Sequence, residues 1–466
     1  MSNEYDIISF MEKEDNNDDL EKQEIERLRR ENALLNNRLH TVERRLKTFE
    51  AMYQKLANSK LGRLTQWYWR YEDAIKAKLG IKPSVSKPSV YNANAKGDEG
   101  FFARMEPKIR EMPESNGCRY YERIDKRIAV ICDQFYWDSV KDAADFIYIE
   151  PDNWQECVKD IDCLLIVSAW QGLGESAKWR GVAHEGTKRR ALAYEIIEHC
   201  KQRNVPAIFY SKEDPPNYDA FLGLAKKCDF VFTSDDGCVP KYREDCGHDR
   251  VWPLHFCINP VYHNPVGLRH QPKEEGVLFA GSWMKKYPER CKDMERMFAG
   301  VLAAGRRLHI VDRCYHLRND GRYRYPAKYL KFQSPAIDHD SLQKVHKLFN
   351  WCININTVKD SSTMFANRVY ELQANGNLLI SNYSRGVSNT FPNVFLIHDQ
   401  KEVGRILDGF TAEEVYERQM AGVRRVMTGE TCYDRVAEML QVVGLATPPP
   451  VRKVLVVATT LNERVQ

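Results

Sequence analysis

The sequence lacks the features that mark several large classes of protein. No apolar run in its 466 residues approaches the length of a membrane span, and the N-terminus has no apolar signal-peptide core. Its 13 cysteines include no C-x-x-C pair, which argues against a zinc cluster or a dithiol redox site. An odd, scattered set of this kind indicates buried, reduced thiols in a cytosolic protein.

An excess of one charge is also missing. The 69 Lys and Arg residues nearly balance the 65 Asp and Glu residues, for a net charge of +4. This balance excludes a strongly electrostatic nucleic-acid binder, so we expect no nucleic-acid partner. What the chain does have is 43% hydrophobic residues, enough at this length for two or three domains with their own cores.

The N-terminal region carries a heptad pattern. Residues 1–20 are acidic and polar and are predicted to be disordered, and residues 21–58 are predicted to form a coiled coil. Five heptads between residues 23 and 57 place apolar side chains and one asparagine, Asn32, at the a and d positions. A buried asparagine at an a position favours two parallel strands in register, so we expect a homodimer through residues 23–57. The alternative is a long solvated helix lying on its own domain.

Residues 59–100 are predicted to form a basic, aromatic helix followed by a linker. Between residues 60 and 80, Lys and Arg alternate with Trp and Tyr, as in helices that lie on anionic membrane surfaces. The charge density is modest, so we favour aromatic side chains that dock on the globular part, with peripheral membrane contact as the alternative. Either reading is compatible with a cytoplasmic protein, in the second case at the inner face of the cell membrane.

From residue 127 onward, short apolar strands alternate with helices, which predicts βαβ units in open parallel sheets. We expect an α/β fold of two Rossmann-like lobes, at residues 101–265 and 274–445, with a ligand cleft between them. Predicted strands in the first lobe are 128–131, 163–167, 207–210 and 230–232, and in the second 276–280, 308–311, 352–355 and 378–380. No G-x-G-x-x-G motif follows the first strand of either lobe, which makes a dinucleotide oxidoreductase the least favoured enzyme class.

The most informative segment is residues 367–381. It predicts a helix with one acid, Glu371, that ends at Gly376 and leads directly into a buried strand. A carboxylate near the ligand-binding edge of such a sheet suits ribose, because it accepts hydrogen bonds from two neighbouring hydroxyls. The alternative is an ordinary helix–loop–strand unit with a solvated Glu.

An ordered set of motifs makes the chain resemble GT-B glycosyltransferases, and within them the CgeB-like (spore maturation protein) group. The resemblance covers roughly residues 127–445. The motifs are Phe209–Pro215, Cys228–Asp235, Phe279–Trp283 with Arg290, the Arg368/Glu371/Gly376 unit and Thr431–Arg435. The resemblance implies transfer of a sugar from a nucleotide-sugar, bound mainly by the second lobe, to a saccharide or glycoconjugate acceptor held by the first. It implies no cofactor and no required metal, and we expect a role in surface polysaccharide synthesis.

By this resemblance Glu371 binds the ribose and Arg368 faces the diphosphate, where a permanent cation stabilises the charge of the leaving group. Arg368 and Glu371 stand three residues apart, so mutual pairing is the alternative. Further residues expected at the donor are Gly376, Gly281, Ser282, Lys286, Arg290 and Thr363. Thr363 occupies the position where many retaining GT-B enzymes have a second acid, so the stereochemical outcome stays open.

The first lobe is expected to supply the acceptor site and, for an inverting reaction, a general base. The catalytic candidates lie at strand ends and in a long loop: Asp214, Glu213, Asp133 and His184. For Asp214, turn formation before Pro215 and Pro216 is an equal alternative. Aromatic faces stack well on sugar rings, so the expected acceptor contacts are Trp170, Glu175, Trp179 and Arg180.

Residues 446–466 contain a fresh apolar strand after Pro448–Pro450. They resemble the start of a GT-A-type domain, which predicts that the chain is a fragment of a larger, bifunctional enzyme; a strand that completes a sheet is the alternative. Two other functions stay open for the whole chain. One is a GT-B-fold epimerase or phospho-alditol transferase, and the other is a non-catalytic scaffold that binds nucleotide-sugars.

Overall fold

The computed structural model describes residues 97–113, 121–174 and 177–445. The predicted coiled coil at 21–58, most of the segment 59–100 and the predicted domain start at 446–466 lie outside the described residues. Among the described residues, no helix combines the length and apolarity needed to cross a bilayer.

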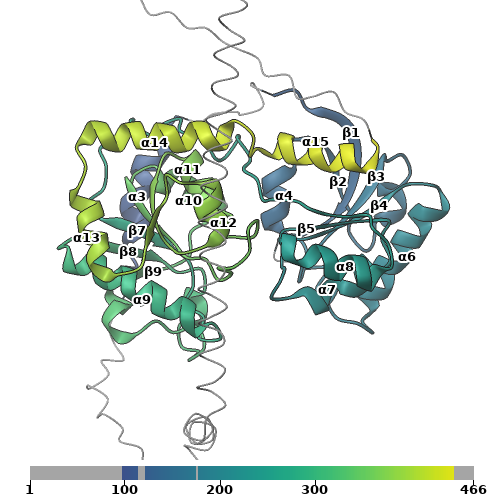
Figure 1. Cartoon of the computed structure of the whole chain (residues 1–466), viewed down its shortest axis with the longest axis horizontal. Coiled ribbons are helices and arrows are strands. Elements are labelled where there is room, and N and C mark those ends of the chain that lie inside the picture. The colour runs from purple at the N-terminus through teal and green to yellow at the C-terminus, as the bar shows by residue number, and fades with distance from the viewer. Residues whose placement is uncertain (1–96, 114–120, 175–176, 446–466) are drawn as a thin grey trace, which may run out of the picture. The chain divides into compact units, whose positions relative to one another are not determined.

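The first lobe is built on a parallel six-stranded sheet in the order β2-β1-β3-β4-β5-β6 (Figure 1). Its strands are β1 (Ile124–Ile131), β2 (Ala144–Tyr148), β3 (Cys163–Val167), β4 (Ala207–Ser211), β5 (Phe230–Thr233) and β6 (Val251–Pro253). Its helices are α4 (Gln134–Val140), α5 (Trp154–Cys157), α6 (Lys188–Gln202), α7 (Tyr218–Ala225), the 3₁₀ turn η2 (Asp236–Cys238) and α8 (Val239–Cys246).

The second lobe has its own parallel six-stranded sheet, in the order β12-β11-β10-β7-β8-β9. Its strands are β7 (Val277–Ala280), β8 (Leu308–Val311), β9 (Gln333–Ser334), β10 (Trp351–Asn354), β11 (Leu378–Asn382) and β12 (Phe395–Ile397). Helices and 3₁₀ turns here are α9 (Pro288–Ala303), η3 (Tyr315–Leu317), η4 (Ala327–Phe332), α10 (His339–His346), α11 (Arg368–Ala374), α12 (Arg385–Thr390), α13 (Gln400–Asp408) and α14 (Ala412–Met427). The predicted fold class, two Rossmann-like α/β lobes, is confirmed.

Alternating residues of each central strand point to opposite faces of the sheet, and both faces are buried. In β1, Ala129 and Ile131 pack on one side with residues of α6, α7 and α8, whereas Ile128 and Val130 pack on the other with α4. The second lobe repeats this arrangement. Leu278 of β7 packs with α10 and α11, and its neighbours Val277 and Phe279 pack with α9 and α13.

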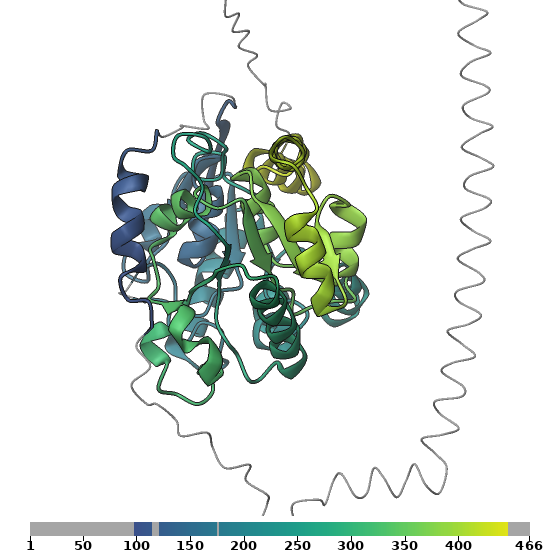
Figure 2. The ribbon, with the colours of Figure 1, turned by 90° about the vertical axis from the view of Figure 1, so that its left-hand side faces the viewer.

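Two helices differ from the predicted lobe boundaries. Helix α3 (Phe101–Arg110) falls within the predicted first lobe, yet its buried side chains join the core that contains α10 and α11 of the second (Figure 2). Helix α15 (Cys432–Val443) follows the second lobe in sequence but packs beside α4 on the first-lobe sheet (Figure 1). Each lobe is therefore completed by a segment from beyond the other.

Candidate functional site

In an open parallel sheet, ligands bind beyond the carboxyl ends of the strands, near the point where the strand order reverses. In the second lobe that point lies between β7 and β10. Gly281 and Ser282 follow β7, Asp312 and Arg313 follow β8, and the loop 355–367 leads from β10 to α11. Gly281, Ser282 and the loop that leads to Arg368 and Glu371 therefore lie at the ligand-binding edge of the sheet.

Three arginines gather at this edge. Burial lowers the pKa of Arg368; Glu371 opposes that shift, and the nearby charges of Arg313 and Arg290 add to it. Burial also lowers the pKa of Arg290, again with a contribution from Arg313. The Nε atom of Arg368 is buried and has no hydrogen-bond partner among the described residues. Neighbouring guanidinium groups, one of them with an unused donor, are suited to a phosphate or diphosphate.

The structure shows Gly281 and Ser282 in supporting roles beside the three arginines. The carbonyl oxygen of Ser282 accepts a hydrogen bond from Arg290 Nη1 at 2.7 Å, which holds the guanidinium in place. The N–H of Gly281, a residue expected at the donor, donates to Val311 O at 2.9 Å and is not free for a phosphate. A Cβ atom on Gly281 would lie 2.6 Å from Phe279 Cζ. Packing against that ring, and not phosphate approach, therefore requires a glycine here.

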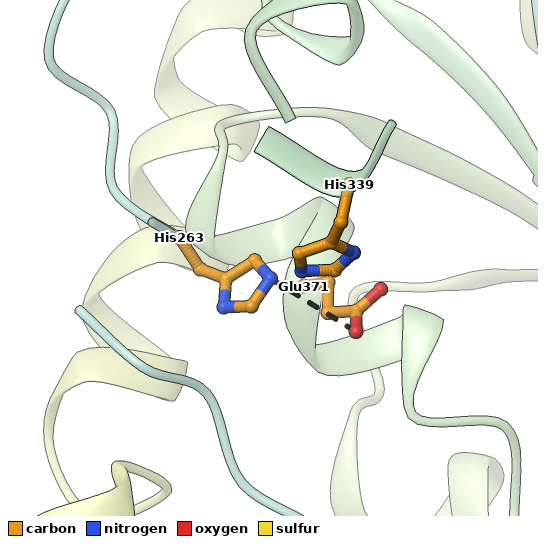
Figure 3. A group of neighbouring side chains, drawn as sticks. All are labelled: His263, His339 and Glu371. Atoms are coloured by element: carbon orange, nitrogen blue, oxygen red, sulfur yellow. Dashed lines mark ion pairs between the residues drawn. The ribbon is translucent and has the colours of Figure 1, made fainter. Parts of the chain in front are cut away.

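Glu371 lies in the first turn of α11 and is 5% exposed. Its Oε1 atom accepts a hydrogen bond from Asn367 Nδ2 at 2.8 Å. No ion pair with Arg368 occurs among the described residues; the Nε2 atom of His263 lies 3.9 Å from Glu371 Oε1. His263, His339 and Glu371 bring their ligand-type atoms within 4.8 Å of one another (Figure 3).

Two other predicted donor residues lie apart from this group. Gly376 follows the C-terminal end of α11, with φ of +82°, and precedes the start of β11. It ends the helix at the edge of the sheet opposite the ligand edge, so its role is to turn the backbone. Lys286 is exposed, and its ammonium group lies 4.6 Å from the ring centroid of Tyr287.

Thr363 and its neighbours contact the first lobe instead of capping α11. The N-cap of that helix is Asn367, which makes no side-chain cap. Thr363 Oγ1 donates to Ser234 O at 2.8 Å and accepts from the N–H of Asp236 at 2.8 Å. Ser361 Oγ donates to Asp235 Oδ1 at 2.5 Å. We call these contacts between residues 234–236 and 361–363 the interlobe latch.

A cavity of about 630 Å³ adjoins the latch. Its walls come from both lobes, and charged and polar side chains dominate them: Asp235, Asp236, Glu289, Thr357, Lys359, Asp360, Ser361, Ser362 and Arg385. The volume suits a sugar unit or a small ligand, and the hydroxyl, carboxylate and cationic groups can bind one through hydrogen bonds.

In the first lobe, a buried lysine joins two of the predicted catalytic acids. Lys212 Nζ lies 2.9 Å from Asp133 Oδ2 and 3.0 Å from Glu213 Oε1. Burial opposes the charge of Lys212, but the two carboxylates outweigh it and raise the pKa of this lysine. Both acids keep part of their side-chain surface exposed, so they can still meet an acceptor. We call this group the Lys212 triad.

Asp214 differs from its neighbours because it is 0% exposed. Thr233 Oγ1 donates to its Oδ2 at 2.6 Å, and Tyr242 Oη donates to its Oδ1 at 3.3 Å. Burial raises the pKa of Asp214 to about 6, against the opposing effect of Thr233 and its other donors. A fully buried side chain cannot contact an acceptor hydroxyl, so Asp214 is not a catalytic candidate in this structure.

The predicted acceptor contacts lie in the long loop after β3 and differ in their exposure to solvent. Trp179 is 0% exposed and donates from its indole nitrogen to Ile149 O at 2.8 Å, so it is a core residue and not an acceptor contact. Trp170 is 39% exposed and packs edge-on against Phe221, with His184 beside it. Arg180 is exposed, and Glu175 lies outside the described residues.

Sequence reasoning missed three residues of these groups: Arg313, Lys212 and His263. Lys212 is next to a predicted catalytic acid, Glu213, at the end of a predicted strand, so the sequence could have identified it as a site residue. Arg313 likewise follows a predicted strand. His263 lies in the irregular segment 254–276 between β6 and β7, where no periodicity marks a buried residue.

One family model and several solved structures are similar to this chain. Residues 295–441 match a family model described as glycosyl transferase-like. A search of curated proteins finds no match. Among solved structures, an alpha-glucosyltransferase (AGT) in complex with UDP has 10% identity and a TM-score of 0.47, over 69% of this chain and 100% of that one. A glycosyltransferase from Rickettsia africae has 12% identity and a TM-score of 0.43, over 68% and 97% of the two chains.

The match at 295–441 extends from α9 through α15 and includes Arg368 and Glu371. The second lobe thus carries a glycosyl transferase-like domain, and with it the predicted enzyme class, a glycosyltransferase, is confirmed.

Proposed function

We propose that the enzyme transfers a hexosyl or related sugar from a nucleoside diphosphate sugar to a hydroxyl of a saccharide or glycoconjugate. The observation that carries this proposal is the proximity of Arg290, Arg313 and Arg368 at the carboxyl edge of the second-lobe sheet, with the buried Nε atom of Arg368 left without a partner among the described residues. These arginines bind the diphosphate and stabilise the charge that develops on it when the glycosidic bond breaks. Glu371 accepts hydrogen bonds from the ribose.

The acceptor binds at the corresponding edge of the first lobe. Asp133 follows β1 and Trp170 lies beyond β3, the two strands between which the strand order of that sheet reverses. Trp170 offers an exposed aromatic face to a sugar ring. Within the Lys212 triad, Asp133 or Glu213 takes the proton of the acceptor hydroxyl if the reaction inverts the anomeric centre.

The cellular role that we propose is assembly of a surface polysaccharide or glycoconjugate by a cytoplasmic homodimer joined through residues 23–57. The heptad pattern and the interleaved basic and aromatic residues at 60–80 support dimerisation and, as the alternative to docking on the globular part, peripheral contact with the inner membrane face.

The test is a calorimetric and thermal-shift screen of UDP, GDP, CDP and dTDP and their sugars. At about 100 times its dissociation constant, a true donor stabilises the folded enzyme by about 2.7 kcal/mol. We expect one nucleotide family to do so, and Glu371→Ala to remove most of the effect. Lys285→Gln, a change in an exposed cation beside the site, is the matched control and should bind normally. Absence of binding by every nucleotide would overturn the proposal.

A further inference from the structure

The segment 254–276 contributes His263, whose side chain is directed at Glu371 (Figure 3). It is 1% exposed, and its Nδ1 atom accepts a hydrogen bond from the backbone N–H of Asn259 at 3.2 Å. Its Nε2 atom lies 3.9 Å from Glu371 Oε1 and has no hydrogen-bond partner among the described residues (Figure 3). A buried, unpartnered ring nitrogen is unfavourable unless a ligand meets it.

The contact with Asn259 assigns the tautomer of His263. Because Nδ1 accepts a hydrogen bond, that nitrogen carries no proton. Burial, which the charge of Glu371 opposes, lowers the pKa of His263 to about 4, so the ring is neutral at neutral pH. Its single proton is then on Nε2, and this atom is a hydrogen-bond donor aimed at the carboxylate.

A ligand atom beside the line that joins His263 Nε2 and Glu371 Oε1 can be within hydrogen-bond distance of both. A distance of 3.9 Å between His263 Nε2 and Glu371 Oε1 is too long for a direct hydrogen bond. A hydroxyl group satisfies both sides, because its oxygen accepts from Nε2–H while its proton is donated to the carboxylate. His339, at the start of α10, is half-buried and is the most exposed member of the group.

Two histidines and one carboxylate also suggest a divalent metal ion. The tautomer of His263 argues against it. Histidines that bind a metal through one nitrogen usually donate a proton from the other to an outer partner, whereas Nδ1 of His263 accepts from Asn259. Metal binding at Nε2 would require loss of the proton that this hydrogen bond places there. The chemistry of the group therefore favours a hydroxyl over a cation.

We propose that His263 and Glu371 bind one ribose hydroxyl of the donor between them, and that His263 thereby selects ribonucleotides over deoxyribonucleotides. This inference rests on the proposed function, which places the donor ribose at Glu371. It adds a residue from the segment that connects the lobes to the donor site. Absence of the bridging hydroxyl leaves Nε2–H and the carboxylate unpaired, which is how a polar site rejects an analogue that lacks the group.

The experiment compares the ribonucleoside diphosphate that binds the wild type with its 2′-deoxy and 3′-deoxy forms by calorimetry. Two variants provide the contrast. His263→Asn keeps, through Oδ1, the acceptor for the N–H of Asn259 but has no donor at the Nε2 position. His263→Gln extends an amide N–H to that position. Thermal unfolding of each variant checks that the fold is intact.

We expect one deoxy form to bind the wild type roughly 10- to 100-fold more weakly than the ribo form. His263→Asn should weaken the ribo form and reduce the discrimination to a fewfold, and His263→Gln should restore part of it. The inference is overturned if the wild type binds both deoxy forms as well as the ribo form, or if His263→Asn discriminates as the wild type does.

A metal ion bound by His263, His339 and Glu371 would give a different result. If the chelated wild type binds no nucleotide until Mn²⁺ or Zn²⁺ is added, and His263→Asn loses that response, the group is a cation site and the hydroxyl assignment is wrong. Failure of the proposed function looks different, because then no nucleoside diphosphate binds the wild type under any condition, and the present inference fails with it.

Discussion

Arg313 is the exposed member of the arginine group, and it tests whether the group binds a diphosphate. Arg313→Gln removes one charge and its forked donors while the interior stays as packed. Since a charge-assisted hydrogen bond contributes about 1.5–3 kcal/mol, we expect roughly 10- to 100-fold weaker binding of the nucleoside diphosphate. Calorimetry with the diphosphate and the monophosphate measures this, and the monophosphate should lose less. Equal losses for both nucleotides would show that Arg313 does not contact the terminal phosphate.

Asp214 makes the stability of the enzyme depend on pH in a predictable direction. Burial raises its pKa to about 6 in the folded protein, above the unfolded value near 3.9. Between those values the folded state binds more protons than the unfolded state, so stability falls as pH rises through this window and stays lower above it. The effect approaches about 3 kcal/mol, at 1.36 kcal/mol for each pH unit between the two pKa values.

The corresponding variant is Asp214→Asn, which does not titrate. Its amide nitrogen must face a donor, Thr233 or Tyr242, so the variant is less stable than the wild type at low pH. Denaturant unfolding from pH 4 to pH 7 should show this difference shrinking as pH rises. A difference that stays constant over the range would mean that Asp214 does not titrate in this window.

At the scale of elements, α11 connects the donor edge of the second sheet to the start of β11, and Gly376 makes that connection. Its φ of +82° lies in the left-handed region, and an added Cβ would lie 2.6 Å from Leu268 Cδ2. Gly376→Ala should therefore lower the free energy of unfolding by about 1–3 kcal/mol. Nucleotide affinity at permissive temperature should stay within a fewfold of the wild type. If Gly376→Ala lost nucleotide binding without a change in stability, Gly376 would be a donor-binding residue as the sequence predicts.

The elements with strong apolar patterns could be predicted from sequence, and the edge strands could not. Lys188–Gln202 is a helix as expected, and β3 and β8 have the expected bounds. The missed strands are β2, β6, β9 and β12, which are short and form the edges of the two sheets. An edge strand is covered less completely, so its sequence need not be apolar: β9 is only Gln333–Ser334, and β6 ends in Pro253.

The place of a candidate residue could be predicted where it follows a strand end, as for Asp133 and Glu213, or lies in the helix after that strand, as for Arg290, Arg368 and Glu371. It could not be predicted where burial decides the role. Trp179 and Trp170 lie in one loop with similar neighbours in sequence, yet only tertiary packing makes one a core residue and leaves the other exposed. The same holds for Asp214 and Glu213, which are adjacent in the chain but differ in access to an acceptor.

At the scale of the whole molecule, neither lobe is a continuous segment. The core of the second lobe includes Phe101, Met105 and Ile109 of α3, and the core of the first includes Tyr433, Val436 and Leu440 of α15. A fragment of residues 274–445 would lack α3 and keep α15 without its partner α4. We expect it to expose apolar surface and to bind a hydrophobic dye, whereas residues 97–445 should not. A soluble fragment 274–445 with cooperative unfolding would contradict this.

The interlobe latch is the whole-molecule feature that links the two sites. Thr363→Val keeps the shape of the side chain but leaves the N–H of Asp236 and the carbonyl oxygen of Ser234 without this partner. Because both groups are in the protein interior or close to it, we expect the free energy of unfolding to fall by about 1–3 kcal/mol. Thr428→Val is the matched control, since it removes a hydrogen bond to Arg424 O within α14 and its C-cap, away from the latch.

Cooperative unfolding of the two lobes distinguishes a latch that couples them from an ordinary hydrogen bond. If the latch couples the lobes, Thr363→Val should split the single unfolding transition or increase protease cleavage in the segment 254–276, and Thr428→Val should do neither. A double-mutant cycle of Ser361→Ala with Asp235→Asn should give a coupling energy of about 0.5–3 kcal/mol across the lobes. Additive effects in that cycle, with one unchanged transition in Thr363→Val, would mean that the lobes are held together by α3, α15 and the connecting segment instead. In that case any effect of nucleotide binding on the acceptor edge of the first lobe would be transmitted by α3, α15 and the connecting segment, and not by residues 361–363.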